Sequence, residues 1–93
     1  MRESQIEAYL RQEIKRIGGL CIKLSPEFEA GIPDRLILVN GKALFVELKS
    51  EGKKPRKIQL HYAEKLKCVG FETKVIDSKE GVNAFVNELI KCG

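Results

Sequence analysis

The stretch GIPDRLILVNGKALFVELK, residues 31–49, contains two apolar segments that meet at Asn40-Gly41. Asparagine followed by glycine between apolar segments favours a two-residue hairpin turn, because both central residues of that turn adopt positive φ angles. We therefore predict a β-hairpin with strands at residues 35–39 and 42–49. The turn also fixes the register, since each pair of opposed residues follows from the turn by counting.

The register places two acidic residues opposite each other at one end of the hairpin. Opposed residues have numbers that sum to 81, so Asp34 lies opposite Glu47. Their Cβ atoms are expected roughly 5 Å apart on one face. Lys49, two residues beyond Glu47, projects from the same face. The two carboxylates repel each other, and a divalent cation between them would relieve the repulsion.

The alternative interpretation of Glu47-Leu48-Lys49 is a solvated pair of charges on a surface strand. Such exposed pairs contribute under about 1 kcal/mol to stability. Glu-x-Lys is also a short motif that occurs often by chance. The hairpin register favours a metal site instead, because it brings both acids and the lysine together without any further assumption.

The composition limits the kinds of site that the chain can build. Its 93 residues, 43% hydrophobic and 32% charged, fit one folded domain spanning residues 1–93. His61 is the only histidine, which excludes metal sites built on several histidines and leaves little material for Ser-His-Asp catalysis. The widely spaced Cys21, Cys68 and Cys92 are predicted to be free thiols. A metal would therefore have oxygen ligands, which favours Mg²⁺ or Mn²⁺.

Positive charge is concentrated immediately after the hairpin. The formal net charge is +4, and residues 49–57 contain five basic residues against one acidic residue. Four of them, Lys53, Lys54, Arg56 and Lys57, form a cluster compatible with binding to nucleic-acid phosphates. No stretch approaches the ~18 apolar residues of a membrane span, and the charged N-terminal sequence lacks a secretory apolar region. We predict a cytoplasmic protein.

Periodic apolar residues predict three helices and two further strands around the hairpin. Helices are expected at residues 3–17 and 56–69 and after an N-cap at Asp77, with strands at residues 20–24 and 71–76. The first helical stripe contains Ile6, Leu10, Ile14 and Ile17, and the last contains Val82, Phe85, Val86, Leu89 and Ile90. Both hairpin faces are apolar, so the hairpin is expected in the middle of a sheet with helices on each side.

Pro33-Asp34 followed by Glu47-Leu48-Lys49 resembles the PD-(D/E)xK motif of restriction-endonuclease-like nucleases. The segments ESQIEAYL, GIPDR, FVELKSEGKKPRKIQ and GFETKVIDS, from about residue 3 to residue 89, resemble the virus-type replication-repair nuclease (VRR-NUC) domain. The ordered set of segments is more specific than the motif alone. The resemblance implies an α/β fold with the restriction-endonuclease-like core, αβββαβα, in which helices flank a mixed four-stranded sheet.

The resemblance also implies a Mg²⁺-dependent endodeoxyribonuclease, with Mn²⁺ able to substitute. The expected catalytic residues are Asp34, Glu47, Lys49, Glu7 and Gln59, and the expected metal ligands are Asp34, Glu47, Glu7 and the backbone carbonyl of Leu48. Glu3 is the second candidate for the acidic residue of the first helix. The alternative interpretation of Gln59 is a solvated helix glutamine.

Family domains of this size that stand alone resemble resolvases of branched DNA. This implies a homodimer that resolves four-way (Holliday) junctions in a bacterium or a phage-infected cell. Two alternatives stay open: a flap- or nick-directed DNA repair nuclease, and a non-catalytic DNA-binding module. The intact set of Asp34, Glu47 and Lys49 favours an enzyme over the module.

Overall fold

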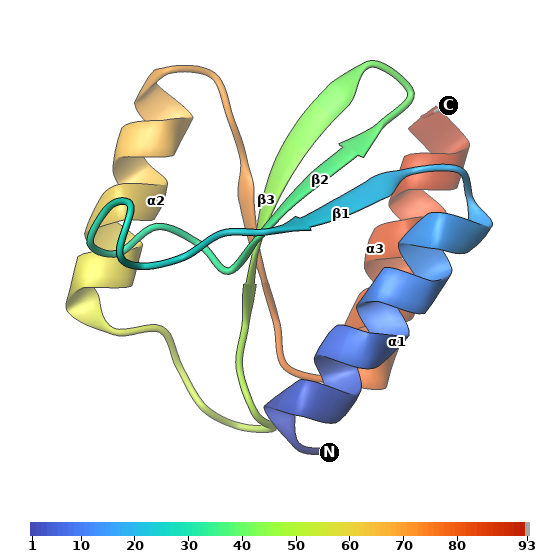
Figure 1. The fold of residues 1–93 in the computed structure, drawn as a ribbon, viewed down its shortest axis with the longest axis horizontal. Coiled ribbons are helices and arrows are strands. Elements are labelled where there is room, and N and C mark those ends of the chain that lie inside the picture. The colour runs from blue at the N-terminus through green and yellow to red at the C-terminus, as the bar shows by residue number, and fades with distance from the viewer. Residues whose placement is uncertain (93) are drawn as a thin grey trace.

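A four-stranded sheet lies between one helix and a pair of helices (Figure 1). The structure is a computed structural model and describes residues 1–92. Its elements are α1 (Glu3–Arg16), β1 (Leu20–Lys23), β2 (Arg35–Val39), β3 (Lys42–Leu48), α2 (Lys57–Cys68), β4 (Thr73–Ile76) and α3 (Lys79–Cys92). Helices α1 and α3 lie together on one side of the sheet, and α2 lies on the other side (Figure 1). The predicted α/β fold and the order αβββαβα are confirmed.

The predicted hairpin forms the centre of the sheet, whose strand order is β1-β2-β3-β4. β1 and β2 are antiparallel, β2 and β3 are antiparallel, and β3 and β4 are parallel, so the sheet is mixed as predicted. Val39 pairs with Lys42, and the turn residues Asn40 and Gly41 have φ angles of 50° and 74°. The predicted register is therefore correct, and its extension by one pair places Asp34 beside β3.

Glycines end α1 and α2, as predicted. Gly18 and Gly70 adopt φ angles of 83° and 97°, which a residue with a Cβ atom adopts only at a cost. After Gly70, the N–H of Phe71 donates to the carbonyl of Leu66 at 2.9 Å. Phe71 therefore belongs to the end of α2, and β4 begins at Thr73 rather than at residue 71 as predicted.

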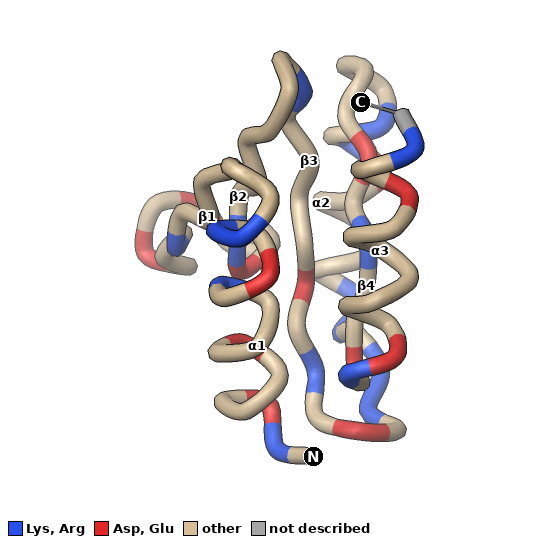
Figure 2. The backbone as a smooth tube through the Cα atoms, turned by 90° about the vertical axis from the view of Figure 1, so that its right-hand side faces the viewer, with Lys and Arg blue, Asp and Glu red and all other residues tan. Residues whose placement is uncertain are grey.

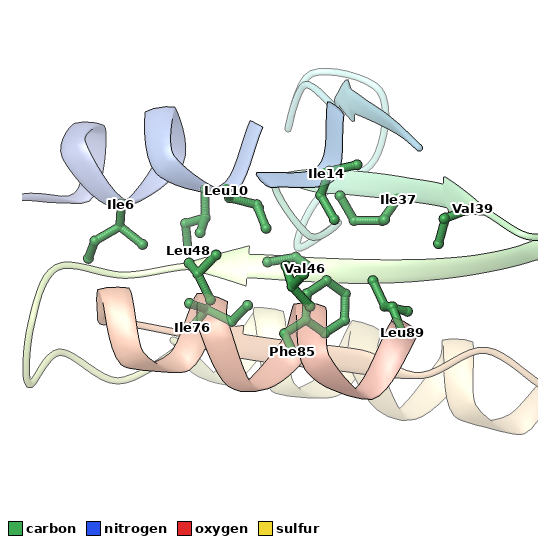
Figure 3. Close-up of a cluster of buried hydrophobic side chains, with 12 residues drawn as sticks. Ile6, Leu10, Ile14, Ile37, Val39, Val46, Leu48, Ile76, Phe85 and Leu89 are labelled. Atoms are coloured by element: carbon green, nitrogen blue, oxygen red, sulfur yellow. The ribbon is translucent and has the colours of Figure 1, made fainter. Parts of the chain in front are cut away.

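The hydrophobic core lies between the sheet and the α1–α3 pair (Figure 3). Its buried side chains are Ile6, Leu10, Ile14, Ile37, Val39, Val46, Leu48, Ile76, Val82, Phe85, Val86 and Leu89. Ile90 was predicted in this stripe but is 50% exposed, because Leu89 takes the inward position and the next residue points about 100° away. Helix α2 contributes no buried residue, so the other face of the sheet is only partly covered.

The N-cap predicted for the last helix is displaced by one residue. Ser78 caps α3, since its Oγ accepts a hydrogen bond from the N–H of Gly81 at 2.9 Å. The Asp77 carboxylate instead accepts a hydrogen bond from the N–H of Gly52 at 3.2 Å. Asp77 is therefore not the cap, and it ties the end of β4 to the loop that connects β3 with α2.

Cys21 and Cys68 are free thiols, as predicted, and the side chain of Cys92 lies outside the described part of the chain. None of the helices within residues 1–92 is long and apolar enough to cross a membrane.

Candidate active site

Glu47 and Lys49 form a buried charged pair at the end of β3. The Glu47 residue is 2% exposed, and its Oε2 lies 3.2 Å from the Nζ atom of Lys49. The Lys49 side chain is itself only 17% exposed. Figure 2 shows the acidic and then the basic segment on β3, at the end of the strand nearer the N-terminus of the chain. The interpretation as a solvated surface pair is therefore wrong.

Asp34 is fixed at the point where β2 begins. Its Oδ2 accepts a hydrogen bond from the backbone N–H of Leu48 at 2.8 Å, so the carboxylate lies against the end of β3. The preceding Gly31 has a φ angle of 83°, and a Cβ atom there would lie 2.5 Å from the carbonyl oxygen of Ile58. Pro33 is fully buried. The predicted constrained approach to Asp34 is present, and it is built on contact with α2.

Gln59 holds the Glu47 carboxylate from the other side. Its Nε2 donates to Glu47 Oε2 at 2.6 Å, and its Oε1 accepts a hydrogen bond from the N–H of Arg56 at 2.8 Å. Gln59 therefore links the first turn of α2 to the site. Gln59 is not a solvated helix residue, because both ends of its amide are bonded within the protein.

The Glu47 carboxylate is poorly compensated where it lies. Its Oε1 atom is buried without a hydrogen-bond partner. Burial raises the pKa of Glu47, the charge of Asp34 raises it further, and the hydrogen bond and charge of Lys49 oppose both. The predicted repulsion between the two acids is therefore present. A buried carboxylate oxygen without a donor, next to a second carboxylate, fits a divalent cation, which prefers oxygen ligands.

Glu7 lies in a separate part of the site, on the α1 side. A cavity of about 330 Å³ is lined by Glu3, Ser4, Glu7, Lys23, Asp34, Arg35 and Leu48. The Oε1 atom of Glu7 lies 3.3 Å from Arg11, and its Oε2 atom lies 3.2 Å from Arg35. Within residues 1–92, no three His, Cys, Asp or Glu side chains are placed to share one metal ion. The role of Glu7 as a metal ligand stays a prediction, and its two arginine partners oppose it.

Comparison with known proteins identifies the family. No protein-family model matches the chain. The chain is 41% identical over 81 residues to "Putative nuclease p44" of Acyrthosiphon pisum secondary endosymbiont phage 1, covering 86% of this chain and 87% of that protein. A solved structure described as a VRR_NUC domain matches with a TM-score of 0.82 and 33% identity, covering 91% of this chain and 94% of that one. The chain belongs to the VRR-NUC family.

This VRR-NUC domain is a nuclease, and nucleases with its fold generally use a divalent metal ion. The sequence prediction missed three residues that line the cavity, Ser4 and the basic Lys23 and Arg35. A signal for Arg35 was available, because it shares the inward row of β2 with the buried Ile37 and Val39. An arginine on an apolar row needs a partner, and Glu7 at the edge of the α1 stripe provides it.

The four predicted DNA-binding residues of the VRR-NUC domain are exposed. Lys53, Lys54, Arg56 and Lys57 lie on the loop after β3 and at the start of α2. The hydrogen bond between Gly52 and Asp77 holds this loop against the end of β4. Their contact with DNA stays a prediction, and their exposure is compatible with it.

The raised pKa of Glu47 predicts how the stability of the metal-free protein changes with pH. The folded state binds this proton more tightly than the unfolded state, so it is favoured at low pH. That contribution is lost as the pH rises from the ordinary value of 4.5 through the higher folded pKa. Glu47→Gln should abolish this loss. The difference in melting temperature, variant minus wild type in EDTA, should increase across that window and then level off.

A difference in melting temperature that stays constant with pH would contradict the conclusion that the Glu47 carboxylate is poorly compensated. Glu13→Gln is the matched control, because Glu13 is paired with Arg16 on α1 and is not among the residues that line the cavity. We expect no comparable pH-dependent increase in melting temperature for that variant.

Proposed function

We propose that this VRR-NUC domain is a Mg²⁺-dependent endonuclease that hydrolyses phosphodiester bonds in branched DNA, and four-way (Holliday) junctions in particular. The observation that carries the proposal is the Glu47 carboxylate, which is buried beside Asp34 with one oxygen unpartnered. A fold that served stability or binding alone would gain nothing from this arrangement, since an unsatisfied buried polar atom is costly. The arrangement favours an enzyme over a non-catalytic module.

Each residue of the site has a distinct task in this proposal. Asp34, Glu47 and the carbonyl of Leu48 would hold Mg²⁺, with Mn²⁺ able to replace it. A divalent ion bound there would lower the pKa of a water and neutralise charge on the phosphate. Lys49 orients the attacking water and places positive charge where negative charge develops. Gln59 keeps the Glu47 carboxylate in a fixed orientation through their 2.6 Å hydrogen bond.

The exposed Lys53, Lys54, Arg56 and Lys57 would bind phosphates of the DNA arms. Such contacts are independent of sequence and sensitive to salt. The sequence offers no element that reads base edges, so the substrate would be recognised by its shape. A cytoplasmic enzyme in a bacterial or phage-infected cell would meet such junctions during replication and repair.

A homodimer would explain how one small domain resolves a junction. Resolution needs two symmetric cuts, and each chain supplies one site. The terminal helices α1 and α3 bury their apolar stripes against the sheet, so they leave little apolar surface for a partner. The opposite face of the sheet is less covered, and its Leu20 and Ile22 on the edge strand β1 are 61% and 39% exposed. We propose this face as the dimer interface.

The test is a cleavage assay on labelled four-way junctions, flaps, nicked duplexes and plain duplexes, with Mg²⁺, Mn²⁺ or EDTA. We expect paired symmetric cuts on the junction with either metal and no cuts in EDTA. Sedimentation at micromolar concentration should show twice the 10.5 kDa mass of the chain. A monomer that makes a single cut on a 5′ flap and none on junctions would establish the repair-nuclease alternative. Binding without cleavage on every substrate would establish the non-catalytic module.

A further inference from the structure

Arg35 lies on the wall of the α1-side cavity, directly beside Asp34. Its side chain is only 11% exposed. Its Nη1 donates to the backbone carbonyl of Asp34 at 2.9 Å, and its Nη2 lies 3.2 Å from Glu7 Oε2. These two contacts fix the guanidinium relative to the backbone of the residue that carries the Asp34 carboxylate. Any group that binds this guanidinium is therefore positioned relative to Asp34.

Arg35 is not fully satisfied by its protein partners. Its Nε atom is buried and has no hydrogen-bond partner. Guanidinium groups carry five N–H donors, and buried donors are normally paired. The contacts with Asp34 and Glu7 account for one partner each of Nη1 and Nη2, which carry two N–H donors apiece, so the Arg35 guanidinium retains donor capacity on the wall of the cavity.

The charges of the cavity explain why an anion would need Arg35. Three acidic residues line it, Glu3, Glu7 and Asp34, whereas only Lys23 and Arg35 are basic. A DNA phosphate that approaches Asp34 would meet net repulsion from these acids unless a cation were close by. Lys23 is exposed, whereas Arg35 is held in place, so Arg35 is the better-ordered counter-charge.

Glu7 is committed to arginines rather than available as a ligand. Its side chain is 15% exposed, and its two oxygens face Arg11 and Arg35. Moving Glu7 to a metal would leave the nearly buried Arg35 charge without its carboxylate partner, which is costly. The contacts therefore assign Glu7 to the task of holding Arg35.

We propose that Arg35 binds a phosphate of the substrate DNA next to the scissile bond, and that Glu7 is a positioning residue that acts through Arg35. This inference rests on the proposed function, because it identifies how the same site holds its DNA substrate. It replaces the predicted role of Glu7 as a metal ligand. Arginine suits the task since its planar fork bonds phosphate oxygens with a defined geometry.

The experiment combines Arg35 variants with junctions in which one phosphate at a time is replaced by an uncharged methylphosphonate. Arg35→Ala should lower kcat/KM on the unmodified junction about 10- to 100-fold, the range of a hydrogen bond to a charged group. Arg35→Lys should recover part of this loss. At the phosphate that Arg35 contacts, the methylphosphonate should impair the wild type but cause little further loss in Arg35→Ala.

The same coupling should appear in junction binding measured by fluorescence anisotropy in EDTA, which does not depend on catalysis or on metal. Additive losses at every scanned phosphate, in both cleavage and binding, would overturn the assignment of Arg35. A wild type that cleaves no DNA would instead overturn the proposed function, so the two failures are distinguishable.

Glu7→Gln separates the two roles of Glu7. If Glu7 is a positioning residue, Glu7→Gln should leave the Mg²⁺ concentration for half-maximal cleavage unchanged. The Arg35→Ala/Glu7→Gln double variant should then have the same kcat/KM as Arg35→Ala. A several-fold increase in the required Mg²⁺ concentration would instead make Glu7 a metal ligand and overturn the assignment. The double variant removes both charges together and leaves no unpaired Glu7 charge, so we expect it to be at least as stable as Arg35→Ala, which a thermal melt of each variant checks. Arg16→Ala, which breaks an ion pair with Glu13 at the far end of α1, is the control and should cleave normally.

Discussion

Asp34→Asn should lower the cleavage rate by about 10³-fold or more while leaving the metal-free protein at least as stable as the wild type. Metal ions supply several kcal/mol of transition-state stabilisation, and about 4 kcal/mol corresponds to roughly a 10³-fold change in rate. The asparagine side-chain oxygen can still accept the hydrogen bond from Leu48 N–H, so the end of β3 keeps its contact. The variant also removes the charge that raises the pKa of Glu47, so it relieves repulsion in the folded state.

Single-turnover cleavage and thermal melts with and without Mg²⁺ measure both effects. Mg²⁺ should raise the melting temperature of the wild type, because it binds only the folded site, and it should not raise that of Asp34→Asn. Asp77→Asn is the matched control, since the Asp77 carboxylate also accepts a hydrogen bond from a backbone N–H but lies outside the site. We expect it to cleave at nearly the wild-type rate. An active Asp34→Asn protein would contradict the model of two carboxylate ligands.

The centre of the fold was predictable because its determinants are local. Asn40-Gly41 fixes the turn, the turn fixes the register, and the register places Asp34 beside β3 across from Glu47. Alternation along the strand then places Lys49 with Glu47, as their 3.2 Å contact shows. None of these steps requires knowledge of how distant segments pack.

The contacts that complete the site depend on packing between distant elements, and the sequence shows them only indirectly. Gln59 reaches Glu47 because α2 crosses the far face of the sheet, which periodicity within α2 does not reveal. Arg35 and Glu7 come together because α1 packs on the inward row of β2. The error at Asp77 has the same origin, since the backbone of the loop at Gly52 binds the carboxylate that was expected to cap α3.

Lys49→Ala should lower kcat by about 10²- to 10⁴-fold, the usual range for a residue that assists proton transfer or orients the attacking water. Junction affinity should be nearly unchanged, because Lys49 is largely buried and bonded to Glu47 rather than available to the DNA arms. The contrasting variant is the double change of Lys53 and Lys54 to alanine. Loss of two phosphate contacts should weaken binding and reduce the slope of log affinity against log salt by about two units, with kcat kept.

Lys49→Ala has one indirect effect that the experiment must separate from loss of catalysis. Lys49 opposes the raised pKa of Glu47, so its removal raises that pKa further and favours the protonated carboxyl, which is not a metal ligand. If this were the whole effect, higher pH or more Mg²⁺ would restore cleavage, since either one favours the unprotonated carboxylate. If Lys49 acts on the attacking water, kcat stays low at saturating Mg²⁺ and at high pH. Full recovery of kcat under those conditions would show that Lys49 acts only through the Glu47 carboxylate.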